Sequence, residues 1–103
     1  MIRYSSPWGT GYNIKLVVNQ YRTYGNLYIG MLTDEGEPYA DLSVNIEPLG
    51  DGEIAVDINN LPDGEKFIRD NGLGEFTGKY LRSGFCRYPV YKMNMEAVHK
   101  HLA

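Results

Sequence analysis

Cysteine is almost absent from this sequence. Cys86 is the only cysteine among the 103 residues, so no disulfide can form within the chain, and the cysteine spacing of small secreted domains is missing. Long apolar runs are absent too: no segment is long enough to cross a bilayer, and the first residues contain no apolar stretch typical of a signal peptide. These absences predict a cytoplasmic protein without a membrane segment.

Basic residues are missing from the middle of the chain. No Lys or Arg lies between Asp34 and Glu65, whereas seven follow from Lys66 onward. The acids of that middle stretch are Asp34, Glu35, Glu37, Asp41, Glu47, Asp51, Glu53, Asp57, Asp63 and Glu65. This division predicts an acidic region and a basic region, each able to attract a partner of opposite charge. The alternative is that the two regions meet as solvated cross-strand pairs.

The apolar residues between Tyr12 and Ile58 alternate with polar ones. Side chains of a strand point to opposite faces in turn, so this period of two predicts four antiparallel strands with one apolar face. The residues expected to be buried are Ile14, Leu16, Ile29, Leu42, Val44 and Val56.

After Pro62 the period changes, and residues 61–72 predict a short helix. Asn60 is the expected N-cap and Gly72 the left-handed residue that ends the helix. Phe67 and Ile68 would then cover the sheet.

The rest of the chain predicts a glycine-rich loop over residues 74–84, a strand over residues 85–93 and a last helix. Pro89 removes a backbone donor and favours an edge position for that strand. The sequence therefore predicts a single α+β domain, an antiparallel meander of about five strands with a short internal helix and a C-terminal helix on one face. Residues 1–11 would form an irregular arm carrying Trp8, residues 12–92 the core, and residues 93–103 the C-terminal helix.

Signatures of catalysis and of metal or phosphate binding are weak. The glycines of residues 72–79 lack the spacing and the following helix of a phosphate loop. Cys86 has no base fixed near it by the sequence, and His99 and His101 diverge on a helix. Asp34, Glu35 and Glu37 lack the alternating ligand pattern of a calcium loop. We therefore expect no enzyme activity, no metal site and no cofactor.

Residues 80–92 interleave aromatic and basic side chains, namely Tyr80, Arg82, Phe85, Arg87, Tyr88 and Tyr91. Such a strand can anchor a protein partner or stack the bases of single-stranded nucleic acid. Its composition is also that of an ordinary strand.

The acidic region is the other candidate surface. Asp34, Glu35 and Glu37 lie on an expected turn, and Asp41 and Asp57 would join them on the polar face of the sheet. Together they could mimic the phosphates of nucleic acid and fit a basic nuclease.

Three segments carry a resemblance to a known family: residues 34–45 (DEGEPYADLSVN), 71–78 (NGLGEFTG) and 83–91 (SGFCRYPVY). Across residues 12–92 the chain resembles a small domain of unknown function found on plasmids, phages and conjugative elements of gut bacteria. It is also similar to some type II-A anti-CRISPR proteins, which inhibit Cas9. The resemblance implies an accessory, non-enzymatic, protein-binding role in mobile-element biology. Nucleic-acid binding through residues 80–92 is the alternative.

Overall fold

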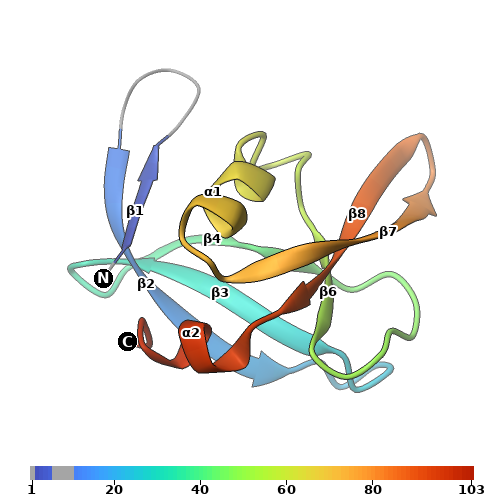
Figure 1. Cartoon of the computed structure of the whole chain (residues 1–103), viewed down its shortest axis with the longest axis horizontal. Helices are drawn as coiled ribbons and strands as arrows, with labels where there is room; N and C mark the ends of the chain where they lie inside the picture. The colour runs from blue at the N-terminus through green and yellow to red at the C-terminus, as the bar shows by residue number, and fades with distance from the viewer. Residues whose placement is uncertain (1, 6–10) are drawn as a thin grey trace.

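The computed structural model describes residues 2–5 and 11–103, which form two antiparallel four-stranded sheets and two short helices around one core (Figure 1). The first sheet has the order β1-β2-β3-β4 and the second the order β5-β6-β8-β7. The elements are β1 Ile2–Ser5, β2 Gly11–Gln20, β3 Leu27–Thr33, β4 Pro38–Asp41, β5 Ser43–Val44, β6 Glu53–Val56, α1 Gly64–Asp70, β7 Gly74–Ser83, β8 Cys86–Met93 and α2 Met95–His99. The coarse prediction of a small α+β fold is confirmed, but the single five-stranded meander is wrong.

The chain passes from the first sheet to the second at Leu42. This residue is fully buried, its N–H donates to the carbonyl of Ile29 at 2.9 Å, and its carbonyl accepts from the N–H of Asp57 at 3.0 Å. A strand that began as β4 therefore ends after Asp41, and a new pairing with β6 begins at Ser43. The alternation shifts there: Ser43 is buried and Val44 is half-buried, so the predicted burial of Val44 is wrong.

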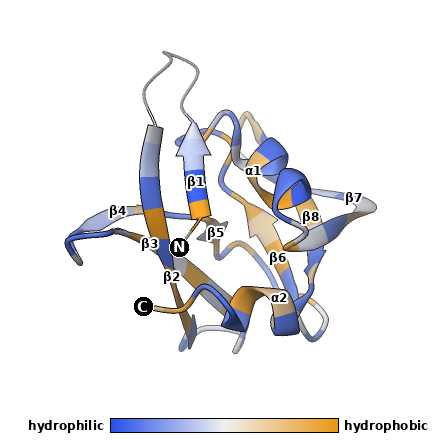
Figure 2. Ribbon diagram, turned by 60° about the vertical axis from the view of Figure 1, so that its left-hand side comes forward, coloured by the Kyte–Doolittle hydropathy of each residue, from blue (hydrophilic) through white to orange (hydrophobic). Residues whose placement is uncertain are grey.

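The other five residues predicted to be buried are confirmed. They belong to one core cluster with Phe67 and Ile68 of α1. Figure 2 shows that hydrophobic residues gather where the two sheets and α2 meet, whereas the turn between β3 and β4 is hydrophilic.

The prediction of an irregular arm over residues 1–11 is wrong for Ile2–Ser5, which form β1 and pair with β2. Ile2 and Tyr4 are buried while Arg3 and Ser5 are exposed, so the same period of two operates here over only four residues. Trp8 lies outside the described residues.

The prediction of a loop over residues 74–84 is also wrong, because Gly74–Ser83 form β7. The glycines that indicated a loop are accommodated in the strand. Gly78 has φ +86°, a left-handed conformation that favours glycine, and it lies where the β7–β8 register shifts between Phe76 and Tyr80.

Helix α1 is shorter than predicted. It begins after Asp63 rather than after Asn60. Its end is as predicted: Gly72 has φ +63°, its N–H donates to the carbonyl of Arg69, and the N–H of Leu73 donates to that of Ile68. These two bonds satisfy carbonyls that the last turn leaves free.

Helix α2 covers only five residues of the predicted span 93–103. Asn94 caps it, as its side chain accepts from the N–H of Ala97 at 3.2 Å. Beyond the helix the chain lies beside β2, where Leu16 donates to the carbonyl of His101 and accepts from the N–H of Ala103. Since β1 pairs with β2 only as far as Ile14, the terminal residues satisfy backbone groups that β1 leaves open.

Phe67 tests the packing of α1 on the sheets. The centroid of its ring lies 5.3 Å from that of Tyr4, and Phe67 is only 5% exposed. Phe67→Ala should lower the free energy of unfolding by about 3–5 kcal/mol, because it leaves a cavity in a small core. Urea denaturation measures this, with Phe85→Ala as the matched control on a fully exposed ring. Equal stabilities of the two variants would contradict this packing.

Candidate functional site

Strands β7 and β8 extend further than the strand beside them. β6 pairs with β8 only from Glu53 to Ala55, opposite Lys92 to Val90, whereas β7 pairs with β8 as far as Ser83 and Cys86. Residues 80–89 therefore form a two-stranded hairpin that projects from the molecule (Figure 1). We call this segment the β7–β8 hairpin.

Pro89 does not mark an edge strand, as the sequence had predicted, because β8 lies between β6 and β7. Pro89 immediately precedes the part of β8 that pairs with β6, since Val90 is the first residue of β8 opposite a residue of β6. On its other side Pro89 faces Tyr80. The central strand tolerates a proline at this position because no neighbour there requires its missing N–H.

One face of the hairpin carries aromatic and arginine side chains. Tyr80 faces Pro89 and Arg82 faces Arg87, so these side chains share a face by the alternation of the strands. The ring of Phe76 lies 5.2 Å from that of Tyr80, and the guanidinium of Arg87 lies 4.0 Å from the Tyr80 ring centroid. We define the aromatic–arginine face as Phe76, Tyr80, Arg82, Arg87 and, at the tip, Phe85.

These aromatic side chains are open to solvent. Phe76 is 42% exposed, Tyr80 43% and Phe85 111%. Phe85 and Gly84 form the two-residue turn of the hairpin, between the paired residues Ser83 and Cys86. A phenylalanine at such a tip contributes no burial to the core.

Arg82 and Arg87 form an unfavourable pair. Like charges that face each other across two strands repel, and neither arginine makes an ion pair in the described part of the chain. The stacking of Arg87 on Tyr80 offsets part of this cost. The pair leaves two cations free at the end of the hairpin.

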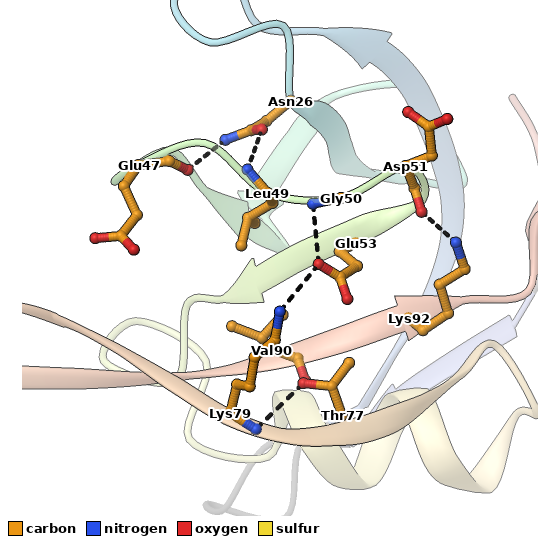
Figure 3. Close-up of polar contacts among 10 residues, drawn as sticks. All are labelled: Asn26, Glu47, Leu49, Gly50, Asp51, Glu53, Thr77, Lys79, Val90 and Lys92. Atoms are coloured by element: carbon orange, nitrogen blue, oxygen red, sulfur yellow. Dashed lines mark hydrogen bonds and ion pairs between the residues drawn. The ribbon is translucent and has the colours of Figure 1, made fainter.

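The two lysines near the hairpin are engaged instead (Figure 3). Lys79 pairs with Glu53 at 3.4 Å, and the Lys92 ammonium donates to the carbonyl of Asp51. Asn26 holds the same loop from the other side: it donates to the carbonyl of Glu47 and accepts from the N–H of Leu49. Glu53 at the start of β6 thus pairs with one lysine, and the carbonyl of Asp51 just before β6 accepts a hydrogen bond from the other.

The structure brings together four of the six basic and aromatic residues predicted from the sequence. Tyr80, Arg82, Phe85 and Arg87 lie on the hairpin, whereas Tyr88 and Tyr91 are buried. Tyr91 donates to Glu65 at 2.8 Å and accepts from Arg69 at 3.1 Å. Burial, and then the bond to Glu65, raise the pKa of Tyr91.

Phe76 is not among the predicted residues, because the glycines of residues 74–84 predict a loop. Only the polar neighbours Glu75 and Thr77 on either side of Phe76 follow a strand period, and the run Tyr80–Ser83 does not alternate.

The five predicted acidic residues lie in two groups. Asp34, Glu35 and Glu37 are exposed on the turn between β3 and β4, and none makes an ion pair within residues 11–103. Asp41 and Asp57 instead line a pocket of about 470 Å³ with Tyr39, Ala40, Asn60 and Leu61.

Both pocket aspartates have partners. Asp41 accepts from the Tyr28 hydroxyl at 2.6 Å, and Asp57 accepts from the Asn60 side chain at 2.8 Å. Of these five acidic residues, therefore, the three on the turn are the ones whose carboxylates make no hydrogen bond or ion pair with the described residues.

Cys86 and the histidines lie apart. Cys86 is half-buried near the tip of the hairpin. His101 instead bonds Leu16 of β2 close to the C-terminus, which Figure 1 shows on the side of the molecule away from the hairpin. Within the described residues, no three His, Cys, Asp or Glu side chains group as metal ligands. None of the helices there is long and apolar enough to cross a membrane.

A family model described as a domain of unknown function (DUF4313) matches residues 15–102, so the chain belongs to that family. The match includes α2 and the residues after it, beyond the span 12–92 over which the sequence resemblance was drawn. No curated protein and no solved structure matches the chain.

The Tyr28–Asp41 contact predicts a pH dependence. The hydrogen bond to Asp41 raises the pKa of Tyr28 to about 12, from an ordinary value of 10.0. The neutral phenol is the favoured form in the fold, so this contribution to stability is present below pH 10 and is lost as the pH rises from 10 to about 12. Asp41→Ala should lower the pKa of Tyr28, measured by the NMR shifts of its ring during titration.

Asp34→Ala is the matched control, because it removes a carboxylate from the β3–β4 turn. An unchanged Tyr28 titration in Asp41→Ala would contradict the assigned contact.

Proposed function

We propose that this domain is a non-enzymatic binding protein that docks on a partner protein through the aromatic–arginine face. The observation that carries the proposal is Phe85, fully exposed at the tip of a projecting hairpin and followed along one face by Tyr80 and Phe76. Aromatic residues and arginine are enriched among the anchors of protein interfaces.

The cost of this arrangement supports a role in binding. Phe85 leaves an apolar ring in water, and burying such a ring in a partner pocket contributes about 1.5–3 kcal/mol. Arg82 and Arg87 repel one another in the free protein, and a partner that contacts them relieves this repulsion.

Single substitutions on the face test the proposal. Phe85→Ala and Tyr80→Ala should each weaken partner binding by about 30-fold or more, since truncation of an anchor costs about 2 kcal/mol or more. The partner is captured from a nuclease-treated host lysate, identified, purified and then titrated by calorimetry. Tyr24→Ala is the matched control, because Tyr24 is also an exposed aromatic on a turn, 54% exposed, but lies away from this face.

Unchanged affinity in both face variants, with both still folded, would show that the partner binds elsewhere.

A second candidate surface is the turn that carries Asp34, Glu35 and Glu37. Three exposed carboxylates without basic partners in the described residues favour a basic target. The sequence resemblance suggests a host defence nuclease such as Cas9 as this target, because the channel of Cas9 is positively charged. Such a role would be that of a cytoplasmic accessory protein of a mobile element.

Nucleic-acid binding through residues 80–92 receives less support. Tyr88 and Tyr91 are buried, Lys79 pairs with Glu53 of β6, and Lys92 donates to the carbonyl of Asp51. Two free arginines remain for phosphate contacts.

Charge reversal tests the acidic candidate. Glu35→Lys combined with Glu37→Lys should slow association with a purified basic nuclease, more at low salt than at high salt, because screening weakens steering. Stopped-flow association rates measure this, and Glu96→Lys on α2 is a control of the same charge type. Association rates that change neither with the charge reversal nor with the salt concentration would show that this turn does not steer the nuclease.

A further inference from the structure

β7 is the open edge of the second sheet. The strand order places it last, beyond β8, and none of the described strands pairs with its outer side. An edge of this kind presents unpaired N–H and C=O groups that can accept another strand.

The turn of the hairpin shows which backbone groups of β7 face outward. Ser83 and Cys86 flank the two-residue turn, and the pair that closes such a turn is hydrogen-bonded. Counting back from it, Tyr80 and Pro89 form a pair without mutual hydrogen bonds, which suits a residue that has no N–H. Such pairs alternate with hydrogen-bonded ones along an antiparallel ladder, and the register continues without a shift to Ser83 and Cys86. Arg82 and Arg87 are therefore also a pair without mutual bonds, and Tyr80 and Arg82 direct their N–H and C=O groups to the open edge.

The bulge confines this open edge to the hairpin. At the register shift the Thr77 hydroxyl donates to the carbonyl of Val90 at 2.8 Å, in place of a ladder bond. The bulge at Gly78 interrupts the outer edge, because a bulge bends its strand and ends regular pairing. Tyr80 to Ser83 remain as a short regular run beyond it.

The charges beside this run are positive and free. Arg82 lies on the edge strand itself, and Arg87 lies one strand further in. Strands are spaced about 4.8 Å apart, so a new strand beside β7 would lie next to Arg82 and about 10 Å from Arg87, within one screening length.

We propose, resting on the proposed function, that the partner supplies an extended acidic segment that adds to β7 beside Tyr80–Ser83 as a further antiparallel or parallel strand. Its backbone bonds the open groups of Tyr80 and Arg82, and its carboxylates face the arginines. This is the strand-addition mode of peptide recognition. A peptide backbone matches the alternating donors and acceptors of the edge, whereas a phosphate chain offers only acceptors and leaves the outward carbonyls unbonded.

The test uses three labelled probes on the full chain: a short peptide of alternating Glu and Val, the same peptide with Lys for Glu, and a single-stranded thymine oligonucleotide. Binding is followed by fluorescence anisotropy from about 0.05 M to about 0.5 M salt. Hydrogen exchange of the backbone amides is followed by NMR with and without peptide. We expect the Glu peptide to bind best and to protect the amides of Tyr80 and Arg82.

Substitutions at Arg82 separate charge from backbone. Arg82→Gln and Arg87→Gln should each weaken binding by about two- to fivefold, and the loss should shrink at high salt. Arg82→Pro also removes the outward N–H and should weaken binding by about two- to tenfold more than Arg82→Gln. Arg22→Gln is the matched control, an exposed arginine on the turn between β2 and β3.

Several outcomes would overturn the inference. These are no binding of the Glu peptide at about 1 mM, binding without protection of Tyr80 and Arg82, or tighter binding of the oligonucleotide than of the peptide. If Phe85→Ala abolishes capture of the protein partner while these amides stay unprotected in the complex, strand addition fails and the proposed function stands. If the peptide protects the amides of Tyr80 and Arg82 but Phe85→Ala and Tyr80→Ala leave partner binding unchanged, strand addition stands and the proposed function fails.

Discussion

The chain crosses from the first sheet to the second at one buried residue, Leu42, whose backbone bonds both sides. Leu42 bonds Ile29 of the first sheet through its N–H and Asp57, just after the second sheet, through its carbonyl. Next to it the Ser43 hydroxyl accepts from the N–H of Ile29 at 3.0 Å. These bonds are made in the core, where an unpaired peptide group costs more than the bond itself contributes. The crossing point is therefore strongly determined, and with it the position of β6, of β8 and of the hairpin that β8 continues.

A line of aromatic rings leads from the core out to the exposed face. Tyr91 is fully buried and is bonded to Glu65 and Arg69 of α1. Phe76 lies 5.7 Å from Tyr91 and 5.2 Å from Tyr80. A two-stranded ribbon alone is marginally stable in water. The rings connect this ribbon to the core and hold its base in place, although its outer half has no third strand.

The sequence allowed β2 and β3 of the first sheet to be predicted, because burial on one face imposes a period of two over local stretches such as Ile14 to Val18. It did not reveal the change of sheet at Leu42, since that depends on bonds to Ile29 and Asp57, which are distant in sequence. β7 was missed for a different reason. Glycine is read as a loop signal, yet Gly78 lies in a bulge within a strand.

The candidate face shows the same division between local and distant causes. Tyr80, Arg82, Phe85 and Arg87 were identified from composition alone. Parity within β8 separates Tyr88 from Arg87, and this much was available in the sequence. Tyr91 has the parity of Arg87 but is buried, because α1 packs over it through Glu65 and Arg69. Strand parity predicts which side chains share a face, and only the packing of other elements decides how much of that face stays open.

The same packing reduces the conformational freedom that the hairpin would lose if it bound a partner. A flexible loop that carried Phe85 and two arginines would lose backbone and rotamer freedom when it docked, and that loss would offset much of the contact energy. Here the strands are already paired and Arg87 is already stacked on Tyr80. The repulsion between Arg82 and Arg87 is likewise incurred in the free protein, where the fold supplies the energy to keep the two charges together. The stability of the core is in this way used to hold an arrangement of like charges that is unfavourable in the free protein and that nearby anionic groups would stabilise.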